Sequence, residues 1–71
     1  MYINLKIEML KSGIKTKDIA QHLGLHRNTV EYKINGKGCF NMNEATKIRD
    51  KFFENLTIDY LFKKQDLKKQ A

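Results

Sequence analysis

The sequence predicts an all-α domain of about five short helices, and three observations support this class. The chain has 71 residues, of which 41% are hydrophobic, enough for one small globular domain with a thin core. Apolar residues recur at helical spacing in successive segments. Proline is absent, and Gly13, Gly24 and Gly36 stand where three of the helices are expected to end.

The opening stretch, YINLKIEML, fits two interpretations. Its apolar residues alternate over residues 3–9 as in a strand, but Ile3, Ile7 and Leu10 also have the spacing of one helix face. The charged residues between them and the Ser12-Gly13 stop favour a helix. We therefore expect a helix in which Ile3, Ile7 and Leu10 share one face.

The second helix is expected to begin at Lys15 or Thr16. Either Thr16 caps it with its hydroxyl, or Lys15 stands at the cap with Asp18 in the first turn, facing the positive end of the helix. Gly24 is expected to end it. The residues expected to point inward are Ile19, Ala20 and Leu23.

A third helix is predicted from His26 or Arg27 to Asn35-Gly36, with Val30 and Ile34 on its inner face. After a loop, Asn41 and Glu44 have the spacing of a capping box. This capping box predicts the start of a fourth helix, over about Met42–Phe53. The fourth helix is expected to bury Ala45, Ile48 and either Phe52 or Phe53. Thr57 is expected to cap a last short helix, Ile58–Phe62, so that residues 1–62 form the domain and residues 63–71 a basic tail.

Ala20, Gly24 and Val30 together indicate a helix-turn-helix unit. A small residue permits two helices to cross closely, a glycine accepts the positive φ of a tight turn, and an apolar residue anchors the second helix. Such a unit holds its second helix away from the body, at a width that enters the major groove of DNA.

The chain resembles the lambdoid phage repressor and Cro family, also called XRE-like, over roughly residues 3–62. The matching residues are Ala20, Gly24, Leu25, Val30 and the Asn35-Gly36-Lys37 stop, and Ile34 is expected to complete the scaffold of the motif. Three positions depart from the family pattern: Thr16 stands where glutamine is common, Lys33-Ile34 replaces an apolar and an acidic residue, and His26 replaces a small hydroxyl cap. The resemblance implies a single-domain, Cro-like repressor.

In that family the recognition helix, the second helix of the unit, reads bases with its first turn. The resemblance therefore places Arg27 and Asn28 at the bases. The chemistry agrees, because arginine can pair with guanine and asparagine with adenine through two hydrogen bonds each. Tyr32 could reach a thymine methyl group or a phosphate, and Glu31 could accept from cytosine or hold the Arg27 guanidinium. The surrounding residues expected to contact phosphates are Thr16, Lys17, His26, Thr29, Lys33, Asn35 and Lys37.

More modest roles remain open for these side chains. Arg27 and Glu31 have the spacing of an ordinary surface ion pair, and Tyr32 could half-bury against the neighbouring loop.

The charge balance favours nucleic acid as a partner. Lysine and arginine number 14 against 8 acidic residues, for a net charge of +6. The family implies a homodimer, at least on DNA, bound to a palindromic operator of double-stranded DNA. The alternative is a protein-interaction module, such as an anti-repressor or an antitoxin-like partner. The apolar residues that could form an interface, with either such a partner or a second copy, are Leu56, Ile58, Leu61 and Phe62.

Other functions are weakly indicated. His22 and His26 are separated by Gly24, and Cys39 is the single cysteine, so we expect neither a metal site nor a disulfide framework. Ser12 is the single serine, and no catalytic constellation or glycine-rich phosphate loop is present. We expect no enzyme activity, no cofactor and no small-molecule substrate. Without a membrane span or signal peptide, the expected location is the cytoplasm of a bacterial host cell.

Overall fold

The computed structural model describes residues 1–64, and within them the chain is all-helical, without strands. The five helices are α1 (Ile3–Ser12), α2 (Thr16–Leu23), α3 (Arg27–Ile34), α4 (Met42–Phe52) and α5 (Ile58–Leu61). The predicted all-α class is confirmed, and the opening segment is a helix rather than a strand. Lys63 and Lys64 are exposed, and the rest of the predicted basic tail lies outside the described residues.

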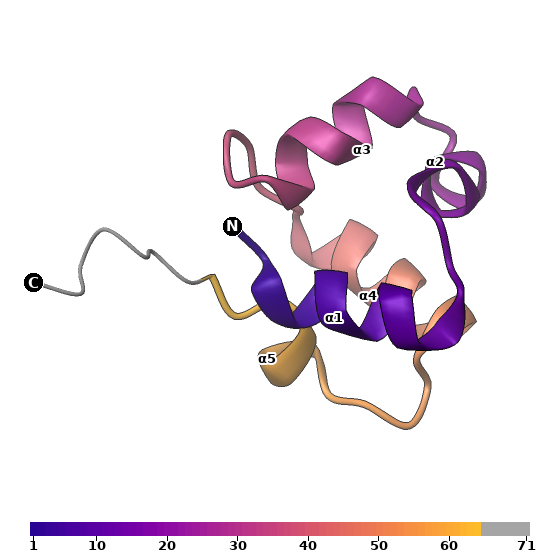
Figure 1. The fold of residues 1–71 in the computed structure, drawn as a ribbon, viewed down its shortest axis with the longest axis vertical. Coiled ribbons are helices and arrows are strands. Elements are labelled where there is room, and N and C mark those ends of the chain that lie inside the picture. The colour runs from indigo at the N-terminus through magenta and orange to yellow at the C-terminus, as the bar shows by residue number, and fades with distance from the viewer. Residues whose placement is uncertain (65–71) are drawn as a thin grey trace, which may run out of the picture.

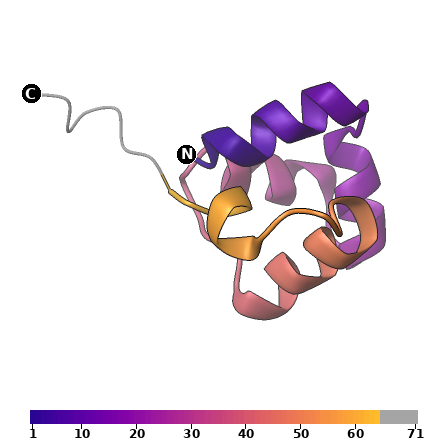
Figure 2. The ribbon, with the colours of Figure 1, turned by 90° about the horizontal axis from the view of Figure 1, so that it is seen from below.

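The helices pack in two groups that share α4. α2 packs against α3 and α4, whereas α5 packs against α1 and α4, and α1 also reaches α3. α3 lies at one side of the molecule, and α5 lies at the opposite side, below α1 (Figure 1). Seen from the side of α5, this short helix is flanked by α1 and α4 (Figure 2). The outward side of α3 is therefore not covered by another helix.

Each of the five helices contributes one fully buried side chain to a common core. These residues are Leu5, Ile19, Val30, Ile48 and Leu61. The single cysteine, Cys39, is free and exposed, so this core is not supported by a disulfide. Because a domain of this size buries only about 60% of its unfolded surface, each of the five side chains contributes a large share of the stability.

The face that α1 buries differs from the expected one. Leu5 and Met9 are buried, whereas Ile7 is 44% exposed and Leu10 is 83% exposed. The backbone N–H of Tyr2 donates to the carbonyl oxygen of Ile34 at 3.0 Å, and the Tyr2 side chain is buried. This long-range bond joins the start of α1 to the end of α3, and Tyr2, Leu5 and Met9 form the stripe that faces the core. The face shared by Ile3, Ile7 and Leu10 is therefore not the one that packs on the core.

The start of α2 follows the second of the two alternatives. Lys15 is the N-cap residue, and its backbone N–H donates to a carboxylate oxygen of Asp18 at 2.9 Å. Thr16 is the first residue of the helix and does not cap it. At the other end Gly24 has φ +72°, and the N–H of Leu25 donates to the carbonyl oxygen of Ala20 at 2.9 Å. This left-handed conformation costs a non-glycine residue roughly 1–2 kcal/mol.

The predicted caps of the last two helices are confirmed, with ends shifted by one residue. Asn41 Oδ1 accepts from the Glu44 N–H at 2.8 Å, and the Glu44 carboxylate accepts from the Asn41 N–H at 3.1 Å. α4 ends at Phe52, and its C-cap, Phe53, is the phenylalanine that is buried. The Thr57 hydroxyl accepts from the Tyr60 N–H, and α5 ends at Leu61 rather than Phe62.

The apolar residues suggested for a partner interface are largely used by the core. Leu61 is fully buried, and Leu56 and Phe62 pack against the core cluster. The Phe62 ring contacts the rings of Tyr2 and Phe40, with centroid distances of 5.8 and 5.5 Å. Of the suggested residues, Ile58 alone is neither fully buried nor part of this cluster, and it is only partly exposed. The interpretation of these residues as core is favoured.

Candidate nucleic-acid interface

The inner face of α3 holds this helix firmly on the body. Val30 is fully buried, and Ile34 and Ala20 are each 4% exposed. Leu25, in the turn between α2 and α3, is partly buried against the core. The scaffold residues singled out in the sequence therefore lie where the packing of α2 on α3 requires them.

α3 carries polar side chains that remain open to solvent. Arg27, Asn28 and Glu31 are exposed, and Tyr32 is 55% exposed. Among the described residues no ion pair joins Arg27 to Glu31. The suggested contact between Glu31 and the Arg27 guanidinium is therefore not formed, and both side chains can bind another group.

The rotation of α3 follows from its buried residues. Each residue advances about 100° around a helix, so Asn28 and Tyr32 lie roughly opposite the direction in which Val30 and Ile34 point. Arg27 lies in the first turn, about 60° from Val30 and 20° from Ile34 around the axis, and it is exposed because it stands at the open start of the helix. Glu31 lies on the flank between this side and the outward edge. Tyr32 therefore faces outward, and Glu31 faces sideways.

Tyr32 packs against the neighbouring loop and is still half-exposed. A Cβ atom added to Gly38 would lie 3.2 Å from Cδ2 of the Tyr32 ring, so the ring packs against the loop at this glycine. About half of the side chain is nevertheless exposed. The loop thus supports the ring without covering it. Gly38 was not identified from the sequence, where it looked like an ordinary loop residue.

The N-terminal end of α3 is open. His26 is the N-cap residue in an extended conformation, and its side chain makes no capping hydrogen bond. The first backbone N–H groups of α3 therefore lack a side-chain acceptor, and they lie at the positive end of the helix dipole. Such an end is a suitable position for an anionic oxygen.

The residues expected to contact phosphates surround this helix, and most of them are open to solvent. The exposed members are Lys17, His26, Thr29, Asn35 and Lys37. Thr16, the first residue of α2, is partly buried.

Lys33 differs from the other expected phosphate contacts. Its ammonium group donates to both carboxylate oxygens of Glu44, at 2.9 and 3.0 Å, and it lies 5.8 Å from the centre of the Phe40 ring. The pair is partly buried and ties the end of α3 to the start of α4. No sequence pattern indicates this pair, because Lys33 and Glu44 are separated by the loop. The geometry does not favour Lys33 as a phosphate contact.

The same pair changes the titration of Glu44. Burial alone would raise the pKa of this carboxyl, but the hydrogen bonds from Lys33 and from the Asn41 backbone outweigh it and hold the pKa below its ordinary value. A lowered pKa in the folded state means that the ionised form stabilises the fold. This contribution is complete above the ordinary glutamate pKa of about 4.3 and is lost as the pH falls through the folded-state pKa.

We therefore expect Glu44→Gln to reduce the free energy of unfolding by about 1 kcal/mol at pH 7, and by less near pH 3. Urea denaturation at both pH values measures the difference. Glu54→Gln, at an exposed position, serves as the control and should leave stability nearly unchanged. An equal loss of stability for Glu44→Gln at the two pH values would contradict the assignment.

The His22 ring packs edge-on against Phe52, with a centroid distance of 5.8 Å. Residues 1–64 contain no group of three or more potential metal ligands. Within the same residues, no helix has the length and apolar character needed to cross a membrane.

Comparisons with known proteins give no match, whether with family models, with curated proteins or with solved structures. The assignment of the candidate interface therefore rests on the geometry of this chain.

Proposed function

We propose that this protein is a sequence-specific DNA-binding regulator, a Cro-like repressor in which α2 and α3 form a helix-turn-helix unit. One observation carries the proposal. The outward edge of α3 bears exposed polar side chains without ion-pair partners among the described residues, while Val30 and Ile34 fix the helix from behind. An exposed helix of this width enters the major groove and presents such side chains to base edges.

The outward edge suggests how bases are read. Asn28 can form two hydrogen bonds with adenine, and Arg27, at the exposed start of the helix, can reach guanine with its longer side chain. Tyr32 can place its ring against a thymine methyl group, because the loop at Gly38 supports the ring and leaves its outer part exposed. Glu31, on the flank beside Arg27, is suited to accept from cytosine.

Phosphate contacts would hold α3 in this position. Lys17 lies in α2, and Lys37 follows the end of α3, so the two lysines precede and follow the recognition helix in the chain, and both are exposed. The open N-terminal end of α3 offers backbone N–H groups to a third phosphate. The net charge of +6 would favour the approach to DNA.

A homodimer on a palindromic operator completes the proposal, with half-sites about one helical turn, roughly 34 Å, apart. Such a regulator would act in the cytoplasm of a bacterial cell. In-vitro selection of bound duplexes, together with the mass of the complex by sedimentation, tests both parts. We expect a selected motif with two-fold symmetry and two chains per duplex. A selected motif without symmetry would count against the dimer.

Salt dependence separates DNA binding from the alternative of a protein-interaction module. Replacing a lysine that neutralises a phosphate should reduce the slope of log affinity against log salt concentration by about 1. We expect this for Lys17→Gln and for Lys37→Gln, measured by fluorescence anisotropy with the selected duplex. Lys11→Gln removes the same charge from α1 and should leave the slope unchanged.

The alternative predicts a different result. A protein partner held by an apolar surface would bind with little dependence on salt, and the lysine variants would not change that dependence. Equal slopes for all three variants on DNA would contradict the proposed phosphate contacts.

A further inference from the structure

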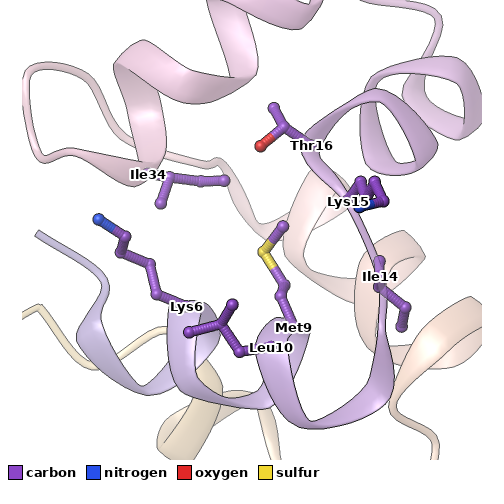
Figure 3. Close-up of a pocket in the computed structure, with 7 residues that line it drawn as sticks. All are labelled: Lys6, Met9, Leu10, Ile14, Lys15, Thr16 and Ile34. Carbon is purple, nitrogen blue, oxygen red and sulfur yellow. The ribbon is translucent and has the colours of Figure 1, made fainter.

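A cavity of about 320 Å³ opens on the side of the molecule where α1, the turn after it and the end of α3 meet (Figure 3). Its apolar lining comes from Met9, Leu10, Ile14 and Ile34. Leu10 is 83% exposed, an unusual position for a leucine in so small a protein. The core does not use this side chain, and the cavity gives it an apolar neighbourhood at the surface.

The polar lining of the cavity is positive. It consists of Lys6 on α1, Lys15 at the start of α2, and Thr16, without a carboxylate. Both lysines are exposed, and neither forms an ion pair with another described residue. In Figure 3 the Lys6 side chain extends along one side of the cavity, and Lys15 lies on the other side. An occupant with an apolar body and one negative group would match this lining.

We propose that this cavity binds a small amphiphilic anion, such as an aliphatic carboxylate. The chain would lie against Met9, Leu10 and Ile34, and the carboxylate would lie at the mouth beside Lys6 or Lys15. The volume is near the lower limit of small-molecule sites, about 300 Å³, which favours a ligand of few atoms. The site does not depend on the proposed DNA binding.

Two larger occupants fit the surface less well. A stable protein partner covers about 800 Å² on each side, whereas the exposed large apolar residues of α1 are only Ile7 and Leu10. A second copy of the chain would bring the lysines of one cavity towards another molecule of charge +6. The positive lining of the cavity therefore favours a small anion as its occupant.

Octanoate is a suitable probe, with octan-1-ol as the neutral compound of the same chain length. Titration of the full-length protein, followed by NMR of its methyl groups, should shift the resonances of Met9, Leu10, Ile14 and Ile34 saturably. The methyl groups of Ile58, which does not line this cavity, should stay in place. We expect octan-1-ol to bind several-fold more weakly than octanoate, because it gains nothing from the lysines.

Matched variants locate the site. Lys6→Gln should weaken octanoate binding by about threefold, whereas Lys11→Gln, on the same helix but outside the lining, should not. Leu10→Gln should weaken octanoate and octan-1-ol alike, and Ile7→Gln should affect neither. Equal binding of the two compounds, or equal effects of Lys6→Gln and Lys11→Gln, would overturn the proposal. Self-association that Leu10→Gln abolishes would overturn it too, because a second copy would then cover the cavity.

Discussion

Asn28→Ala is expected to weaken binding to the selected operator by roughly 5- to 150-fold and to remove the preference for one base pair. The range corresponds to about 1–3 kcal/mol for a bidentate contact between a side chain and a base. Asn28 lies at the outward edge of α3 and is exposed, so its replacement should not disturb the fold. Fluorescence anisotropy with the operator and its single-base-pair variants measures affinity and preference together. Arg27→Ala should give a similar reduction in affinity at a different base pair.

The chain offers close controls for these two variants. Asn55→Ala replaces an exposed asparagine in the turn between α4 and α5, and it is the control for Asn28→Ala. Arg49→Ala replaces an arginine of α4, and it is the control for Arg27→Ala. Both should bind the operator as the unmodified protein does. If Arg27→Ala and Asn28→Ala leave affinity and base preference unchanged, α3 does not read DNA in the proposed manner.

The features that could be predicted from the sequence are local. The capping box of Asn41 and Glu44 spans four residues, and the turn at Gly24 depends on one backbone conformation. The inner face of α3 is fixed by Val30 and Ile34, one turn apart. Each of these features depends on residues within one or two turns of a helix, so it can be inferred from a short stretch of the sequence.

The features that could not be predicted depend on contacts between distant segments. The face that α1 buries depends on its packing against α3 and α5, together with the hydrogen bond from the Tyr2 N–H to the Ile34 carbonyl oxygen, and Leu10 lies outside this face. Lys33 forms an ion pair with Glu44 across a loop, and the composition of α3 does not indicate this pair. Both features bear on the candidate sites, because Leu10 and Ile34 line the cavity beside α1, and Lys33, paired with Glu44, is not favoured as a phosphate contact.

Leu61→Ala should cause the largest reduction in stability among the changes considered. Leu61 is fully buried, and α5 has only four residues, so this helix is held by packing rather than by its own hydrogen bonds. Truncation of a buried leucine costs about 2–5 kcal/mol. A chain of this length has a total stability of about 4–11 kcal/mol, so the variant should be largely destabilised or unfolded at 37 °C. Thermal denaturation followed by circular dichroism measures the change.

Leu10→Ala is the matched control, because it makes the same chemical change at a leucine that is 83% exposed. It should alter the free energy of unfolding by no more than about 0.5 kcal/mol, since alanine is also the better helix former. The two leucines thus test the rotation of α1 as well as the core. If Leu10→Ala destabilises the protein as much as Leu61→Ala does, Leu10 is buried, and both the orientation of α1 and the cavity beside it are wrong.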